Sequence, residues 1–293
     1  MKKRILVVTA IALALMISLG GIEDFPLSTV DAAQLDFAGC GITKKAFMKE
    51  LSQAYEKKTG VKIVLGGGGA TKGIRLPAKG AVALGGSCRH ALDHPEEKTA
   101  KLHHVAWDAL VVMVNKDNPV DNITMDQLKR LLKGEIKNWK ELGGADSSIR
   151  LLIRKGKSSG VGLSLRELVF NNPDEEFSPE ALIRKSSGPV EEGIEHDKLA
   201  MGVSGISSAK KRTNAKLLAL DGKTPSKENI GSGKYPLVRP LYLVTKGEPA
   251  GEVKNFIDFA LSKEGQAIIS AQGTVNLEEG KALSSMNMRA GLK

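Results

Sequence analysis

The stretch 61–90, VKIVLGGGGATKGIRLPAKGAVALGGSCRH, decides the fold of this chain. Apolar residues at 61, 63 and 65 predict a strand that ends at four consecutive glycines. Glycine tolerates positive φ and lets backbone N–H groups approach a ligand, and a helix that opens at Ala70 offers its first N–H groups to an anion. A second apolar piece, 81–84, runs through two glycines into Ser87, Cys88 and Arg89. These two strand ends, one followed by a cation, predict two walls of an oxyanion-sized pocket.

Composition narrows the kind of ligand. With 293 residues the chain is long enough for two domains, and its net charge of +10 favours an anionic ligand. Aromatic residues make up only 4% and do not alternate with basic runs, so we expect no nucleic acid. The nucleotide-binding pattern G-x-x-x-x-G-K-[ST] is not met around Lys72, because Gly73 follows it. We therefore expect no cofactor.

Residues 1–32 have the pattern of an export signal. Three basic residues at 2–4 precede an apolar run at 5–19, and small residues at 30 and 32 offer a cleavage site. We expect an exported protein, in the periplasm or on the cell-surface side of the inner membrane. Cleavage of the leader and its retention as an anchor both stay open.

The rest of the chain predicts an α/β fold with mostly parallel sheets. Two long apolar strands, at 105–115 and 236–245, are typical of two chain crossings between two lobes with a cleft between them. We place lobe 1 at 34–112 plus 238–293 and lobe 2 at 113–237. Other expected elements are helices at 44–58, 125–133 and 163–170, a strand at 149–153, an irregular segment at 171–190 and one amphipathic helix at 253–272.

Three runs carry a family likeness: WDALVVMVNKDNPV at 107–120, ITMDQLKRLLKGEIKNWKELGG at 123–144, and DGKTPSKENIGSGKYPLVRPLYLVT at 221–245. The chain resembles the phosphate-binding proteins of ABC importers. The resemblance implies a two-lobed periplasmic binding protein of the second topological type. It also implies a monomeric, non-enzymatic protein that binds an oxyanion or related small solute in the interlobe cleft. Its membrane partner would be an ABC permease or a membrane sensor to which it presents the ligand.

The resemblance also implies three ligand loops. The first supplies Gly39, Cys40, Gly41 and Thr43; the second Gly69, Ala70, Thr71, Ser87, Cys88 and Arg89; the third Ser159 and Gly160. Asp108 begins a crossing strand at the cleft. Arg154 and Lys155 precede the third loop and either face the cleft or belong to a solvated loop.

Several of these positions depart from the family pattern. Cys40, Ala70, Cys88 and Val161 stand where the family has Ser or Thr, and Ala83 stands where it has an aspartate that accepts the proton of hydrogen phosphate. A hydroxyl donor to a buried anion contributes about 1.5–3 kcal/mol. We therefore expect phosphate to bind weakly.

The two cysteines admit three interpretations. Two thiols beside Arg89 would suit a thiophilic solute such as arsenite, whereas an oxidising compartment favours a disulfide. A cysteine-dependent enzyme is the third hypothesis, but no motif places a His–acid pair beside either cysteine, so we expect no catalytic residues.

Four histidines, at 90, 94, 103 and 104, follow Cys88 closely and are of a type that ligates metals. The segment between them is polar, charged and contains Pro95, which is typical of an exposed loop. We therefore expect no metal site.

Overall fold

The computed structural model describes residues 34–284, so the predicted export signal at 1–32 lies outside the described residues. Within 34–284, no helix combines the length and the apolar character that crossing a membrane requires.

Nine strands follow the order β2-β1-β3-β11-β4-β8-β6-β7, with β9 paired to β4. The neighbours of β1 and of β6 are parallel, whereas β4 and β11 run antiparallel to the strands beside them. This confirms the predicted α/β fold with mostly parallel pairing and two crossing strands. The strands are β1 (Gln34–Gly39), β2 (Lys62–Leu65), β3 (Leu84–Ser87), β4 (Ala100–Asn115), β6 (Arg150–Arg154), β7 (Leu182–Arg184), β8 (Ala200–Gly205), β9 (Ala215–Leu217) and β11 (Val238–Lys246); β5 (Asn122–Ile123) and β10 (Ala219–Leu220) form a separate pair.

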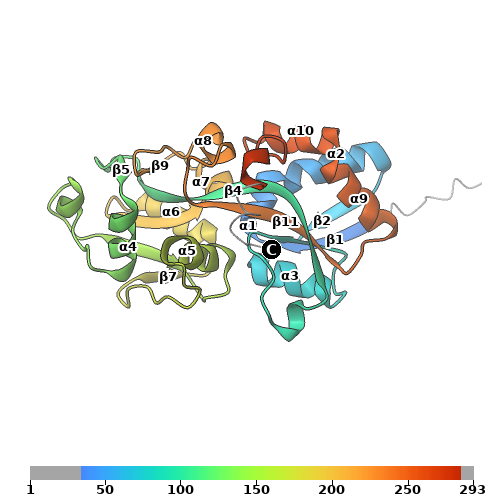
Figure 1. Ribbon diagram of the computed structural model, residues 1–293, viewed down its shortest axis with the longest axis horizontal. Helices are drawn as coiled ribbons and strands as arrows, with labels where there is room; N and C mark the ends of the chain where they lie inside the picture. Colours follow the sequence, from blue (N-terminus) through green and yellow to red (C-terminus); the bar gives the residue numbers. More distant parts are fainter. Residues whose placement is uncertain (1–33, 285–293) are drawn as a thin grey trace, which may run out of the picture. The chain divides into compact units, whose positions relative to one another are not determined.

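Helices cover the strands on both sides. In Figure 1, α2, α9 and α10 lie on one side of β1 and β2, and α3 lies on the other. The helices are α1 (Gly41–Thr43), α2 (Lys49–Thr59), α3 (Gly69–Ala78), α4 (Met125–Lys133), α5 (Gly160–Phe170), α6 (Ser187–His196), α7 (Ile206–Ala209), α8 (Lys227–Gly231), α9 (Gly251–Leu261) and α10 (Lys263–Ala271). The chain also forms a π-helical turn, η1 (Lys44–Met48), and two 3₁₀ turns, η2 (Pro95–Glu97) and η3 (Trp139–Leu142), and residues 281–284 are helical.

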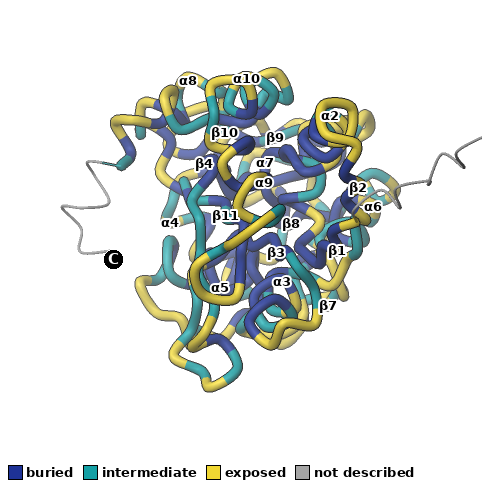
Figure 2. The backbone as a smooth tube through the Cα atoms, turned by 90° about the vertical axis from the view of Figure 1, so that its right-hand side faces the viewer, coloured by how far each residue is buried: buried dark blue, intermediate teal, exposed yellow. Residues whose placement is uncertain are grey.

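Strand β4 belongs to two hydrophobic cores. Val105 and Ala106 pack with Phe37, Phe47 and Phe256, whereas the next residues of β4 pack in the core that contains α4 and β8. The first half of β4 pairs with β11 and the second half with β8 and β9. Figure 2 shows these central strands as mostly buried, in contrast to α2 and α8. Two cores fit a two-lobed fold, and the lobe boundaries expected from the sequence stay a prediction.

Local signals set several element ends. The Thr124 hydroxyl and the Gln127 side chain form a reciprocal capping box at the start of α4. Gly134 ends this helix at φ 75°, and Gly60 ends α2 at φ 78°. These ends lie where the sequence pattern predicts them.

Two expectations were wrong. The segment 171–190, predicted to be irregular, contains β7 and the start of α6. The helix predicted at 253–272 is two helices, because the Ser262 side chain accepts the Gly265 N–H (3.2 Å) and caps α10. A Cβ on Gly265 would lie 2.1 Å from the Phe259 carbonyl oxygen, so the break depends on a glycine there.

Candidate ligand-binding cleft

A cleft of about 370 Å³ opens where the carboxyl ends of β1, β3 and β6 meet the starts of α3, α5 and α6. Parallel sheets commonly bind ligands at this edge, because helix N-termini and loops converge there. The cleft is lined by Gly39, Cys40, Gly41, Ile42, Lys44, Lys45, Gly67, Gly68, Gly69, Ala70, Cys88, Arg154, Gly160, Val161, Ser186, Ser187, Gly188 and Ser208.

Two buried thiols form one wall of this cleft. Strand pairing sets Gly39 opposite Gly86, and the Cys40 N–H donates to the Gly86 carbonyl (3.1 Å). Cys40 and Cys88 therefore follow neighbouring strand ends, and their side chains lie close enough for each thiol to affect the pKa of the other. Both cysteines are free, with 4% and 1% of their surface exposed.

The two thiols differ in how readily they ionise. Burial opposes ionisation of Cys40, but hydrogen bonds from Cys88 and Thr43 and the charge of Arg239 outweigh it and lower the pKa of Cys40 to about 7. The pKa of Cys88 is raised, because its hydrogen bond to Cys40 and its burial both favour the protonated thiol. Near neutral pH Cys40 is therefore partly ionised, whereas Cys88 keeps its proton.

The start of α5 closes directly onto these thiols. A Cβ on Gly160 would lie 2.4 Å from the Cys88 sulfur and 3.0 Å from the Ala70 Cβ, so only a glycine fits without a shift. Arg239 Nη1 donates to the carbonyls of Cys88 (3.3 Å) and Gly160 (3.2 Å) and so ties the two loops together. Its charge is neutralised by the buried carboxylate of Asp108, 2.9 Å from Nη2.

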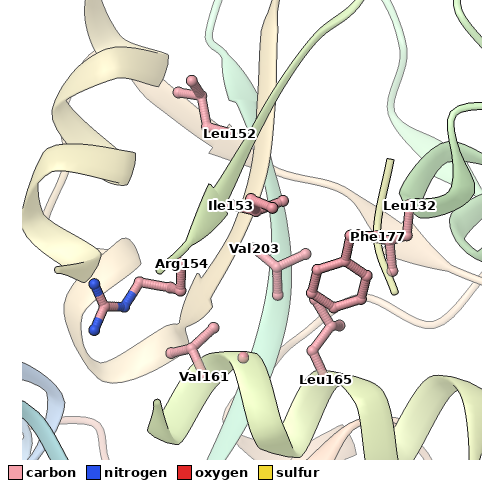
Figure 3. A pocket seen from close by; sticks show the side chains of 9 residues that line it. Leu132, Leu152, Ile153, Arg154, Val161, Leu165, Phe177 and Val203 are labelled. Atoms are coloured by element: carbon pink, nitrogen blue, oxygen red, sulfur yellow. The ribbon is translucent and has the colours of Figure 1, made fainter. Parts of the chain in front are cut away.

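The cleft lining also contains basic side chains. Arg154, at the end of β6, donates from Nη1 to the Arg184 carbonyl (3.1 Å), and Figure 3 shows its guanidinium directed away from the apolar side chains beside it. Burial lowers the pKa of Arg154, whereas the neighbouring thiol pair opposes that shift. Lys44 Nζ donates to the Leu65 carbonyl (3.2 Å). None of the described residues that line this cleft is acidic.

Seven of the thirteen residues expected to bind the ligand line the cleft: Gly39, Cys40, Gly41, Gly69, Ala70, Cys88 and Gly160. Ser87 and Ser159 instead make hydrogen bonds within their own loops: the Ser87 hydroxyl donates to the Arg89 carbonyl, and the Ser159 hydroxyl accepts the Gly162 N–H. The Thr43 hydroxyl donates to the Cys40 carbonyl (2.9 Å). Thr71 donates to the Ser158 carbonyl (3.1 Å), and Asp108 pairs with Arg239. Ala83 and Lys155 are also outside the lining.

Arg89 is the most consequential of the residues that lie away from the lining. It is 2% exposed, and its two Nη atoms each lie 2.8 Å from a Glu97 carboxylate oxygen. Its Nε donates to the Ser158 carbonyl (2.9 Å), so the guanidinium has neither charge nor donors left for a ligand. The sequence pattern does not indicate this ion pair, because nothing in it links Glu97 to Arg89.

Several residues that line the cleft were not among the predicted ligand residues. Lys44 and Lys45 follow the first loop directly, and a basic pair next to a glycine turn is a signal that could have found them. Ser186, Ser187 and Gly188 lie in the segment that was predicted to be irregular, where no local pattern marks the start of α6.

The histidines take structural positions. His103 lies 2.8 Å from the Thr245 hydroxyl, and His104 stacks edge-on against Trp107. Within 34–284, no three His, Cys, Asp or Glu side chains are grouped so that they could hold a metal ion.

Comparison with known proteins adds independent information. Residues 33–264 match the model of the family described as "PBP superfamily domain". The chain is 29% identical over 249 residues to the phosphate-binding protein PstS of Borreliella burgdorferi, covering 82% of this chain and 89% of that protein. It is also 29% identical over 261 residues to PstS of Bacillus subtilis, covering 87% and 85%.

A solved structure shows the same likeness. A putative phosphate ABC transporter substrate-binding protein with bound phosphate, from Clostridium perfringens, superimposes with a TM-score of 0.76 at 28% identity. The alignment covers 83% of this chain and 99% of the other. This supports the two-lobed fold of periplasmic binding proteins.

Proposed function

This chain belongs to the PBP superfamily, and from that premise we propose that it is the extracytoplasmic solute-binding component of an ABC importer, with a small oxyanion as its ligand. The similar proteins from Borreliella burgdorferi and Bacillus subtilis are named as phosphate-binding proteins, not as enzymes. That the chain itself has no catalytic activity stays a prediction.

One observation supports an anionic ligand most strongly: the cleft lining contains cations and glycines but no carboxylate. The glycine segment 67–69 lies in the lining directly before α3, and the N-termini of α3 and α5 provide aligned N–H donors. Arg154 takes the role that the sequence analysis gave to Arg89, because its guanidinium lies in the lining.

The lining also suggests which oxyanions bind. A protonated oxyanion such as hydrogen phosphate carries an O–H that needs an acceptor when it is buried. With no carboxylate in the lining, the cleft gives hydrogen phosphate no advantage over an oxyanion without a proton, such as sulfate.

Titration calorimetry of the purified protein at pH 7.5 tests this proposal, with phosphate, arsenate, sulfate and molybdate in separate titrations. We expect at least one of them to bind, and phosphate to bind no more tightly than sulfate. Absence of binding for all four would overturn the proposed ligand class. A strong preference for phosphate over sulfate would show that other groups accept its proton.

The thiol pair favours a second candidate, a thiophilic solute such as arsenite. Cys40 and Cys88 are both free and both line the cleft, and two adjacent thiols can each replace one hydroxyl of As(OH)₃ with release of water. Titration with arsenite tests it: wild type should bind, and Cys40→Ser and Cys88→Ser should each lose most of the affinity. Unchanged affinity in either variant would exclude a dithiol complex.

Import and ligand presentation to a membrane sensor require the same ligand-binding behaviour, so binding data do not separate them. Uptake of the labelled ligand by cells with and without the gene does separate them. We expect loss of uptake in the deletion strain. Unchanged uptake with altered gene expression would favour the sensor.

A further inference from the structure

We propose that Cys40 and Cys88 are a site of reversible oxidative modification, and that a disulfide between them strengthens binding of the oxyanion. The effect on binding rests on the proposed function, whereas disulfide formation does not. The sequence contains no other cysteine, so no third thiol competes for either sulfur.

The geometry favours an intramolecular disulfide. The two thiols follow neighbouring hydrogen-bonded strand ends, and each affects the pKa of the other, so the two sulfurs lie close together. A disulfide needs Cβ atoms roughly 3.5–4.5 Å apart, whereas facing side chains on adjacent strands lie roughly 4.5–5.5 Å apart, so bond formation requires side-chain rotation and a small shift of the two loops. Both cysteines line the cleft, so an oxidant approaches them from there.

The reaction balances with a small disulfide, X–S–S–X, as the oxidant. The Cys40 thiolate attacks one sulfur of the oxidant, and X–S⁻ leaves. The Cys88 thiol then loses its proton, and its sulfur attacks the Cys40 sulfur of the mixed disulfide and expels the second X–S⁻. One protein disulfide and two molecules of X–SH result, and a dithiol reductant reverses both steps.

The charges around the pair determine the effect on the ligand. Arg239 on β11, Asp108 on β4 and Arg154 on β6 interact with the thiols, and the pair Asp108–Arg239 is neutral overall. Lys44 and Lys45 lie on the same cleft wall, and Lys45 is paired with Glu191. A Cys40 thiolate therefore competes with a bound anion mainly for Arg154. Because a disulfide carries no charge, oxidation leaves the guanidinium to the ligand.

The competition depends on pH in a defined direction. The pKa of Cys40 is lowered to about 7, because hydrogen bonds from Cys88 and Thr43 and the charge of Arg239 outweigh its burial. The thiolate therefore accumulates as pH rises through neutrality. We expect the affinity of the reduced protein for an oxyanion to fall between pH 6 and pH 8, and that of the oxidised protein to change little.

The experiment compares the purified protein after reduction and after treatment with oxidised glutathione, with sulfate as the probe. At pH 8 we expect the reduced form to bind about tenfold more weakly, the size expected for one nearby charge that solvent partly screens, and at pH 6 we expect a smaller gap. A thiol count should fall from two to none without any change in molecular size. The double variant Cys40→Ser/Cys88→Ser is the control and should show no difference between the treatments.

Two results would overturn the proposal: two free thiols after the oxidant, or equal measurable affinities of the oxidised and reduced forms. The proposed function can fail separately. If the thiol count falls to none but the disulfide form binds none of the oxyanions tested, the ligand class is wrong and the modification site stands.

Discussion

Two arginines beside the glycine-rich loops differ sharply in their surroundings. Arg89 is buried against Glu97, which also accepts Arg75 Nε (2.9 Å) and the Leu92 N–H (2.9 Å). Arg154 is partly exposed in the cleft lining and donates to the Arg184 carbonyl. The first region uses its cation to hold a loop in place, and the second leaves its cation available to a ligand.

The comparison teaches a rule for assigning ligand residues. A cation next to a binding loop is a ligand candidate only when no carboxylate already neutralises it, because a bidentate ion pair uses both its charge and its directed donors. By this rule Arg154 is a candidate ligand residue and Arg89 is not. The predictions below test the rule from the largest expected effect to the smallest.

Glu97→Ala should destabilise the protein by about 3–5 kcal/mol, because it leaves Arg89 as a buried charge without its partner. Urea denaturation monitored by circular dichroism measures the change. Glu96→Ala is the matched control, since Glu96 pairs with the more exposed Lys79 and Arg75 and should cost at most about 1 kcal/mol. Equal losses in the two variants would show that the Arg89 pair has no special structural role.

Arg154→Ala should weaken oxyanion binding by about 10- to 100-fold, because a charge-assisted hydrogen bond contributes about 1.5–3 kcal/mol. Arg154→Lys should recover part of the affinity, since it restores the charge but not the planar fork. Calorimetry measures both. Arg150→Ala on the same strand, where Arg150 pairs with Asp197 at the surface, should bind as wild type does. Wild-type affinity in Arg154→Ala would show that a cation without a carboxylate partner need not bind the ligand.

The sequence predicted the features that local chemistry decides. The strand before the glycines and the helix at 125–133 were both predicted, and the residues that start and end this helix, Thr124 and Gly134, lie directly beside it. The expectation that both thiols lie at the cleft came from the family resemblance rather than from a local pattern. Features that depend on distant partners were not predicted in this way, such as the start of α6 in the cleft lining.

Arg89 shows why the site was predicted only in part. Its partner Glu97 lies eight residues further on, brought back by the 3₁₀ turn η2 that begins at Pro95. The sequence contains both charges, but nothing in the pattern alone says that this turn folds onto the arginine rather than into solvent. Arg154 presented the same ambiguity, and its side chain faces the cleft.

Gly160→Ala should weaken oxyanion binding by about fivefold, because the new Cβ meets the Cys88 sulfur and opposes closure of α5 onto the first wall. The expected cost, about 1 kcal/mol, is at the low end for overpacking, since a single sulfur can shift. Gly41→Ala is the control, because a Cβ there meets nothing within 4 Å. Calorimetry should show that Cys88→Ala removes most of the Gly160→Ala penalty. If Gly160→Ala still weakens binding to the same extent in the presence of Cys88→Ala, the new Cβ does not act through the Cys88 sulfur.

The smallest effect should come from Lys45, which lines the cleft but is already paired. Its Nζ lies 3.3 Å from Glu191 Oε2 and 2.8 Å from the Ser208 hydroxyl, and its side chain is 40% exposed. Glu191 is buried, and it keeps Arg212 as a partner (3.0 Å) when the lysine is lost. We therefore expect Lys45→Met to lower oxyanion affinity by no more than about threefold, measured by the same calorimetry as for Arg154→Ala. A loss of tenfold or more would mean that Lys45 leaves Glu191 to contact the ligand, and a carboxylate partner would then no longer disqualify a cation as a ligand residue.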